Sequence, residues 1–348
     1  MAHLQLTKRQ DETFDSINTL ELSNDYGTPN TIKQALKGPE SELWKQSATA
    51  EINNFLKRGS WKFIKKDSIL KQGRKPIGTK WVFKIKDESN HTKRYKSRIV
   101  TKGYMQIPGV DYTEKFSPVA TASSLRIGLA LTLYNDQEEN PWVCELVDVE
   151  AAFLEGRLKR STYIDIPQGM IELGFMTQAE FDENCIELLG GMYGNVDAAL
   201  LYFMRFTTFA INQDGLGMTQ SESDPCVFFR RDKKGDNDLI IIIYVDDCML
   251  IGNQATVNEA KALIRTEFGT TEDGQLRKLL GVRYEWKRNM DGESYIKMSM
   301  NDKANEIIDS YQKVTGRTPK VYETPGAPGT VLEKNEGKMV NIEGYRSL

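Results

Sequence analysis

Two adjacent aspartates, Asp246 and Asp247, interrupt one of the most apolar parts of the sequence. The flanking segments, 240–245 and 248–252, are as short as strands and mostly aliphatic, which predicts a hairpin with the acids at or near its turn. Carboxylates beside an apolar core are costly unless their charge is compensated. A divalent cation would compensate it, because hard cations prefer oxygen ligands. The alternative is a solvated turn, in which Asp is common.

A third aspartate, Asp148, lies near the end of a predicted strand over residues 143–149. One acid at a strand end and an acidic pair on a later hairpin would suit two-metal phosphoryl transfer, in which two cations clamp the attacking and leaving oxygens. Without metal, three close carboxylates would repel one another and the pKa of at least one would rise. Because a single strand-terminal Asp is usually a cap or turn residue, the hypothesis depends on the order of all three acids.

The composition narrows the chemistry further. With 348 residues, 39% of them hydrophobic and 27% charged, the chain fits a soluble globular protein with one large domain or a few subdomains. We see no secretory signal and no apolar run near the ~20 residues of a membrane span. Two distant histidines and four scattered cysteines leave little for a zinc site or a His-dependent triad. A metal would be held by carboxylates and would be Mg²⁺ or Mn²⁺.

A basic segment, residues 57–103, contrasts with the acidic remainder of the chain. Its only acids are Asp67, Asp87 and Glu88, and its aromatic residues are Trp61, Phe63, Trp81, Phe83 and Tyr95. Interleaved basic and aromatic side chains suit contacts with phosphates and bases. The alternative is a solvated charged surface.

The periodicity predicts the elements that position these residues. An amphipathic helix is expected over residues 44–56, and the basic segment is expected to form a hairpin of strands 81–86 and 95–100. In the second strand, alternation places Lys96 and Arg98 on one face. The other predicted elements are a helix at 123–134 with Ser123 or Ser124 as its N-cap, a helical turn at 153–154, helices at 198–209 and 256–268, and a strand at 279–286.

Several segments then match the motifs of one family in order. Residues 244–247, YVDD, look like the YxDD signature of reverse transcriptases. Residues 148–156, DVEAAFLEG, look like the DVxxAFLxG motif of copia-type LTR retrotransposons. The other matching segments are 80–86 with 95–103, 111–119, 166–170 and 345–348. The chain therefore resembles the reverse transcriptase domain of a copia-type LTR retrotransposon polyprotein, from about residue 28 to its last residue.

The resemblance implies an α+β, right-hand polymerase fold with fingers, a palm made of an antiparallel sheet packed on helices, and a partial thumb. The expected divisions are a poorly ordered lead-in at 1–29, an N-terminal helix and fingers at 30–142, a palm at 143–286 with finger insertions near 160–190, and a C-terminally truncated thumb or connection at 287–348. The abrupt end is expected of a fragment of a longer polyprotein or of a truncated element.

The resemblance also implies roles for individual residues. Asp148, Asp246 and Asp247 would be the catalytic carboxylates and, with the main-chain carbonyl of Val149, would hold two Mg²⁺ or Mn²⁺ ions. The residues expected at the incoming nucleotide are Lys84, Lys96, Arg98, Ala152, Phe153 and Asp197, and those expected at the primer are Tyr244, Leu280 and Gly281. Phe153 would be an aromatic steric gate beneath the sugar, although its apolar neighbours also permit a core position.

The implied activity is RNA-directed DNA polymerisation, in which dNMP is added to a primer 3′ end. Its partners would be an RNA and DNA template-primer and dNTPs, with no membrane. The implied location is intracellular, in a cytoplasmic virus-like particle or the nucleus.

One segment departs from the family pattern. Within residues 192–202, Asp197 stands where copia-type enzymes have Gln, along the expected nascent base pair. This acid supports a second hypothesis, a catalytically decayed or domesticated module that binds nucleic acid. A third, a palm-type RNA-dependent RNA polymerase, fits less well because such enzymes usually have Gly-Asp-Asp and no aromatic residue at the position of Phe153.

Overall fold

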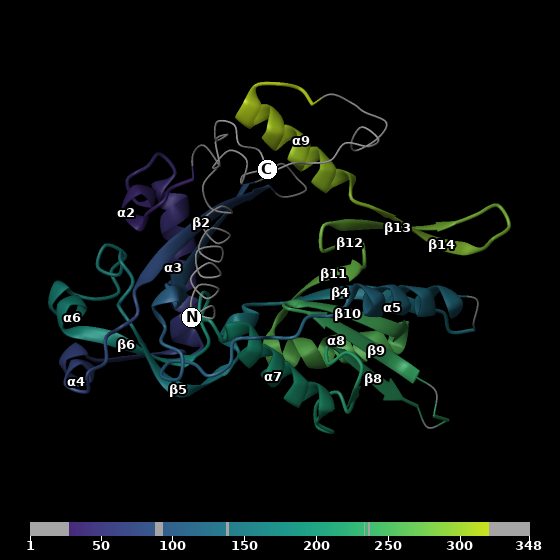
Figure 1. Cartoon of the computed structure of the whole chain (residues 1–348), viewed down its shortest axis with the longest axis horizontal. Helices are drawn as coiled ribbons and strands as arrows, with labels where there is room; N and C mark the ends of the chain where they lie inside the picture. The colour runs from purple at the N-terminus through teal and green to yellow at the C-terminus, as the bar shows by residue number, and fades with distance from the viewer. Residues whose placement is uncertain (1–27, 88–92, 137–138, 233, 236, 320–348) are drawn as a thin grey trace, which may run out of the picture. The chain divides into compact units, whose positions relative to one another are not determined.

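The computed structural model describes residues 28–87, 93–136, 139–232, 234–235 and 237–319 (Figure 1). The expected lead-in therefore lies outside the described residues except for its last two, and so do all residues after 319. The chain separates into two compact units, a larger one that ends at Leu276 and a smaller one that begins at Arg277. Helices and antiparallel sheets occur in both units, which confirms the predicted α+β class.

An antiparallel sheet forms the centre of the larger unit (Figure 1). Its strands, in spatial order, are β11 (Thr270–Gln275), β4 (Trp142–Val149), β10 (Asp247–Asn253), β9 (Asn237–Tyr244), β8 (Val227–Arg231) and β7 (Thr219–Gln220). In β10, every residue from 248 to 252 is buried. A strand covered on both faces needs an unbroken apolar run rather than alternation, which explains the aliphatic flanks of the paired acids. The predicted hairpin is confirmed.

Helices cover both faces of this central sheet. On one face, α5 (Ala122–Tyr134) packs so closely that a Cβ on Gly128 would lie 2.6 Å from Ile251 Cδ1. On the other, Tyr202 of α7 (Ala198–Ile211) interacts with Cys248, which alternation places opposite Ile251. The helix α8 (Gln254–Phe268) also packs against β4 and β10. All three helices were predicted.

The start of α5 differs from the prediction. Its N-cap is Thr121, whose hydroxyl accepts a hydrogen bond from the N–H of Ser124. The expectation that Ser123 or Ser124 caps the helix was wrong, because both already lie inside it while Thr121 keeps the extended backbone of a cap.

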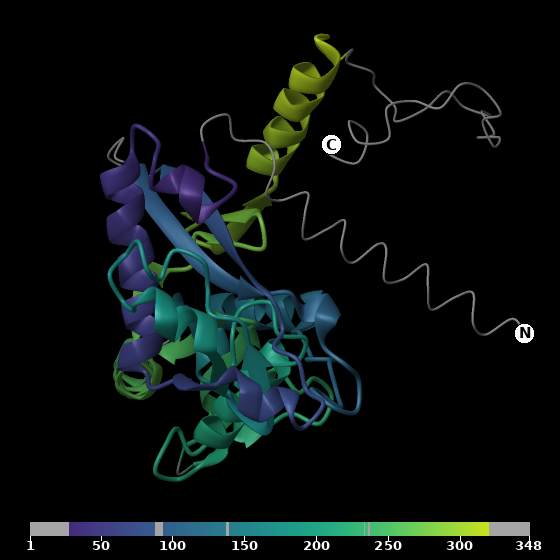
Figure 2. The same cartoon turned by 90° about the vertical axis from the view of Figure 1, so that its left-hand side faces the viewer.

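A long β-ribbon, β2 (Thr79–Asp87) paired with β3 (Lys93–Thr101), confirms the predicted basic hairpin. The predicted amphipathic helix, α3 (Ser41–Lys57), runs along β3 (Figure 2). Ser47 and Glu51, one helical turn apart, accept hydrogen bonds from the N–H groups of Ser97 and Ile99 at 2.8 and 3.2 Å. Side chains of the helix thus accept hydrogen bonds from N–H groups at the open edge of the ribbon, and these bonds fix the position of β3.

The remaining elements of the larger unit pack around the ribbon and the central sheet. A further antiparallel sheet has the order β1 (Trp61–Lys65), β6 (Asn184–Gly190) and β5 (Arg157–Ile164). The short helical segments are α2 (Ile32–Ala35), α4 (Lys66–Leu70), η1 (Gly103–Met105), η2 (Ala152–Leu154) and α6 (Gln178–Glu183). The turn η2 confirms the helical turn expected at 153–154. None of the helices in the described residues combines the length and the hydropathy that a membrane span requires.

The smaller unit contains β12 (Lys278–Leu279), β13 (Val282–Arg288), β14 (Ser294–Ser299) and α9 (Asn301–Thr315). The strand predicted over 279–286 is confirmed from Val282 onward but is interrupted before it, because Leu280 and Gly281 form a tight turn with φ of +52° and +77°. Two consecutive positive φ values are typical of a type I′ hairpin turn. Arg283 of β13 pairs with Asp302 of α9 at 2.9 Å, which ties the helix to the hairpin.

Candidate active site

The three aspartates meet at one end of the central sheet. Asp247, the first residue of β10, lies directly opposite Asp148 in the ladder between β10 and β4. Asp246 lies in the preceding turn, and its main-chain carbonyl accepts a hydrogen bond from the N–H of Val149 at 3.0 Å. Directly opposed residues of an antiparallel pair point to the same face, so Asp148 and Asp247 share one face of the sheet.

Val245, the other residue of this turn, has a φ of +58°. A positive φ at the first central position is typical of a type II′ hairpin turn, which usually has glycine there. A β-branched residue in this conformation is strained. The paired strands on either side of the turn must therefore hold it, and they fix the position of Asp246.

Electrostatic interactions connect these acids to the ribbon. Burial raises the pKa of Asp246 and the charge of Asp148 raises it further, while Arg98 and Lys96 of β3 oppose the shift. For Lys96, burial and the neighbouring cations lower the pKa, and Asp148 counteracts them. The cations of the ribbon and the acids of the sheet therefore lie within electrostatic reach of each other. Asp148 also accepts a hydrogen bond from the Thr271 hydroxyl at 2.9 Å.

The predicted division of the two faces of β3 is confirmed. Lys96 and Arg98 are half-buried, whereas Ser97 and Ile99 between and beyond them are buried. Lys84 lies opposite Lys96 on β2 and is exposed. The face that carries the cations is thus accessible to a ligand.

A ring contact connects the ribbon to η2. The Arg98 guanidinium lies over the ring of Tyr193, 4.9 Å from its centroid. Phe153 meets the same ring edge-on, with the two centroids 5.6 Å apart. Ala152, beside it in η2, is buried. The structure therefore brings two of the predicted nucleotide-binding residues, Arg98 and Phe153, to a shared partner.

Asp197 occupies the N-cap position of α7 but makes no side-chain capping hydrogen bond. Burial raises its pKa, and the charge of Asp111 raises it further. Its Oδ1 atom is buried and has no hydrogen-bond partner in the described part of the chain. This acid therefore sits in an environment that disfavours its charged form.

The predicted primer-binding residues lie in both units. Tyr244 ends β9 opposite Asp247, while Leu280 and Gly281 form the tight turn of the smaller unit. Their contact with a primer stays a prediction.

Metal binding can be judged from the donor atoms. The described residues contain no group of three or more His, Cys, Asp or Glu side chains arranged to hold a metal ion. Mg²⁺, however, is usually bound by one or two carboxylates together with substrate phosphates rather than by an all-protein cage. Asp148 and Asp246 are close enough for the charge of one to raise the pKa of the other, so their oxygen donors fit such an ion.

Two residues near the site were not singled out from the sequence, Tyr193 and Glu51. Burial raises the pKa of Glu51 to about 7, although the Ile99 N–H and the charges of Arg98 and Lys96 oppose the shift. Glu51 could have been noticed in the sequence as an acidic residue beside the apolar stripe of α3. The signal for Tyr193 was weaker, since only its nearby glycines mark it.

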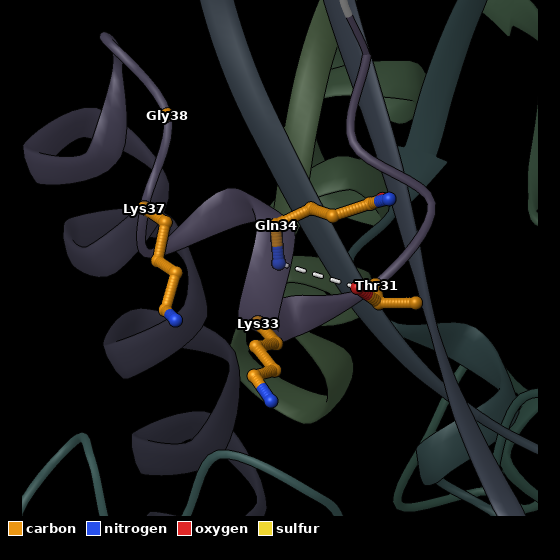
Figure 3. A pocket seen from close by; sticks show the side chains of 5 residues that line it. All are labelled: Thr31, Lys33, Gln34, Lys37 and Gly38. Atoms are coloured by element: carbon orange, nitrogen blue, oxygen red, sulfur yellow. Dashed lines mark hydrogen bonds between the residues drawn. The ribbon is translucent and has the colours of Figure 1, made fainter.

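Surface hollows add little to this site. A narrow one beside the acidic turn is lined in part by Val245, Ile243 and Tyr202. A wider, open one lies at α2 (Figure 3), and its lining residues are Thr31, Lys33, Gln34, Lys37 and Gly38. The wider hollow contains none of the acids and cations described above, so it is not part of the candidate site.

Comparisons with known proteins place the sequence among Pol polyproteins. Residues 60–325 match the family model described as reverse transcriptase (RNA-dependent DNA polymerase). The chain is 31% identical over 264 residues to a retrovirus-related Pol polyprotein from transposon TNT 1-94 of Nicotiana tabacum, covering 75% of this chain and 18% of that protein. It is 28% identical over 323 residues to the corresponding polyprotein from transposon RE1 of Arabidopsis thaliana, covering 92% and 20%. The chain spans about a fifth of the length of these curated relatives.

A search of solved structures finds a foamy viral protease-reverse transcriptase in complex with double-stranded DNA. The TM-score is 0.33 and the identity 12%, over 79% of this chain and 37% of that one. A TM-score this low does not establish a shared fold, so the sequence matches carry the comparison.

Proposed function

This chain belongs to the reverse transcriptase (RNA-dependent DNA polymerase) family, within the copia-type group whose motifs it carries, and from this premise we propose that it adds deoxynucleotides to a primer 3′ end on an RNA or DNA template. One observation carries the proposal: Lys96 and Arg98 of the ribbon lie within electrostatic reach of Asp148 and Asp246. Nucleotidyl transfer needs this pairing, because the triphosphate requires cations and the activating metal ions require carboxylates.

The elements take the parts of a right-hand polymerase in this proposal. The ribbon with α3 forms the fingers, the central sheet with α5, α7 and α8 forms the palm, and the smaller unit begins the thumb. The antiparallel order of the central sheet supports the assignment of the palm, because Asp148 and Asp247 lie opposite each other on adjacent strands.

Asp148, Asp246 and Asp247, with the main-chain carbonyl of Val149, would hold two Mg²⁺ or Mn²⁺ ions. Such ions, when bound, lower the pKa of the attacking hydroxyl and neutralise charge on the leaving pyrophosphate. The chain supplies the placement of the carboxylates. The ladder between β4 and β10 aligns Asp148 with Asp247, and the strained turn holds Asp246.

The remaining residues would bind and select the substrates. Lys96 and Arg98 would contact the triphosphate, and the planar guanidinium of Arg98 suits bidentate contact with phosphate. Phe153 would lie beneath the sugar, where its ring leaves no room for a 2′-hydroxyl. The other assigned residues are Lys84, Ala152 and Asp197 at the nucleotide, and Tyr244, Leu280 and Gly281 at the primer.

A second candidate function is nucleic-acid binding without extension. The observation that favours it is the environment of Asp197, a buried acid in a segment expected to lie along the nascent base pair. A module of this kind would bind nucleic acid through its basic ribbon, with an affinity that falls steeply as salt rises.

Primer extension with Mg²⁺ or Mn²⁺ on RNA and DNA templates separates the two candidates. We expect the wild type to extend a primer on both templates. The rate of Asp246→Asn should be more than about a hundredfold lower, the size expected when a charge that acts on the reacting groups is removed. Asp214→Asn, at an exposed aspartate, serves as the matched control. Equal extension by wild type and Asp246→Asn would end the proposal, and salt-sensitive binding without extension would support the binding module.

A further inference from the structure

Tyr193 lies where the ribbon, η2 and the loop after β6 meet. Its main-chain carbonyl accepts hydrogen bonds from the N–H and the hydroxyl of Thr101, at 2.8 and 3.2 Å. Its ring contacts both the Arg98 guanidinium and the Phe153 ring. One side chain therefore contacts a residue assigned to the triphosphate and a residue assigned to the sugar.

Two glycines allow this placement of Tyr193. A Cβ on Gly191 would lie 2.2 Å from the carbonyl oxygen of Phe153. Gly194 has a φ of +86°, and its Cβ would lie 2.3 Å from the carbonyl oxygen of Thr101. The backbone is thus pressed against η2 on one side of Tyr193 and against β3 on the other, which only glycine permits. The main chain itself holds the ring between the two elements.

We propose that Tyr193 is a positioning residue that couples recognition of the triphosphate to recognition of the sugar of a deoxynucleoside triphosphate. This inference rests on the proposed function and deepens it. The face of the ring holds the Arg98 guanidinium by a cation–π contact, and the edge-to-face contact holds Phe153. The Nε atom of Arg98 is buried and has no hydrogen-bond partner among the described residues, so the cation–π contact supports the guanidinium alongside the charges of Glu51 and Asp246.

A coupling residue leaves a pattern that neither of its neighbours shares. Loss of Arg98 alone should raise KM for dNTP, and loss of the Phe153 ring alone should lower the preference for dNTP over rNTP. Loss of the Tyr193 ring should do both at once. The value of kcat should change less, because Tyr193 interacts with the acids only through the charge of Asp246, whereas its ring contacts Arg98 and Phe153 directly.

The experiment compares Tyr193→Leu, Tyr193→Phe and Tyr193→Met in steady-state single-nucleotide incorporation with dNTP and rNTP. Tyr193→Leu should raise KM for dNTP about fivefold and lower dNTP preference about fivefold, the sizes expected for one cation–π contact and one aromatic pair. Tyr193→Phe keeps both ring contacts and should restore both values.

Tyr193→Met covers the case in which leucine disturbs the fold. The flexible side chain of methionine can fill most of the space left by the tyrosine ring and can still contact the Phe153 ring through sulfur. It offers no π face to Arg98. It should therefore raise KM while keeping most of the dNTP preference. Tyr134→Leu makes the same chemical change at a side chain that is 81% exposed and is the matched control. Thermal unfolding of each variant confirms that it is folded.

The outcomes separate the two levels of the argument. If the wild type extends primers and Tyr193→Leu keeps wild-type KM and dNTP preference, the inference is overturned and the proposed function stands. A uniform fall in kcat for both substrates, with an unchanged preference, assigns Tyr193 a structural role only and also overturns it. If the wild type extends no primer, the proposed function fails and the inference falls with it.

Discussion

The carboxyl group of Glu51 should make the stability of the larger unit depend on pH. It packs between α3 and β3, where it accepts a hydrogen bond from the Ile99 N–H. Burial raises its pKa from 4.5 to about 7 even though the Ile99 N–H and the charges of Arg98 and Lys96 pull the other way. Desolvation therefore outweighs the attraction of the two cations, and the fold favours the protonated acid.

The size and sign of the effect follow from proton linkage. Each unit of difference between folded and unfolded pKa is worth about 1.36 kcal/mol, so a rise from 4.5 to about 7 corresponds to about 3 kcal/mol. Between these two pH values the folded chain binds more protons than the unfolded chain. The free energy of unfolding therefore falls as pH rises through this window, and the full penalty is present above the folded pKa.

Glu51→Gln removes the charge and keeps an oxygen that accepts the Ile99 hydrogen bond. We expect it to raise the free energy of unfolding by up to about 3 kcal/mol at pH 8 and to leave it nearly unchanged at pH 4. Equilibrium urea unfolding, followed by circular dichroism at both pH values, measures the difference. Glu42→Gln, at an exposed position of the same helix, should change it by less than about 0.5 kcal/mol. Destabilisation by Glu51→Gln at pH 8 would refute the reasoning, because Glu51 would then be stabilised as an anion by the cations.

Three further predictions concern the gate, the glycine contact and the metal. Phe153→Val should raise the relative use of ribonucleotides, because a smaller side chain leaves room for a 2′-hydroxyl; an unchanged rNTP/dNTP ratio in single-nucleotide incorporation would count against the gate. Gly194→Ala should lower the free energy of unfolding by about 3 kcal/mol in urea titrations, since it combines a strained φ with a close approach to Thr101. Gly59→Ala, with positive φ but no neighbour within 4 Å, should cost only about 1 kcal/mol, and equal losses would contradict the contact. EDTA should stop primer extension and added Mg²⁺ should restore it, so extension in EDTA would exclude metal-dependent catalysis.

The regular elements near the site follow from local patterns in the sequence. Period-two alternation identified β3 and the shared face of Lys96 and Arg98, and an apolar run broken by two acids identified the hairpin of β9 and β10. The direct pairing of Asp148 with Asp247 joins residues about a hundred positions apart. No local pattern encodes that register, so only the order of the motifs suggested that these acids meet.

The errors and omissions have local causes. Thr121, Ser123 and Ser124 all carry hydroxyl groups that can cap a helix, and the sequence does not show which of them keeps an extended backbone. The turn at Leu280 interrupts an apolar strand pattern at a residue whose type does not favour positive φ. Tyr193 makes its contacts because the neighbouring glycines let the backbone approach segments that are distant in the sequence. Such contacts leave no periodic signal in the sequence.

The acids of this site lie in the interior of a sheet, whereas the cations lie on a two-stranded ribbon. β4 and β10, which carry Asp148 and Asp247, each have a hydrogen-bonded strand on both sides. Amide hydrogens in these two strands should be among the slowest of the larger unit to exchange with solvent. Within the described part of the chain, β3 pairs with β2 alone, and side chains of α3 cover its other edge. A ribbon held in this way should bend more easily than a sheet interior, so in the proposed polymerase the cations would adjust to a substrate more readily than the acids.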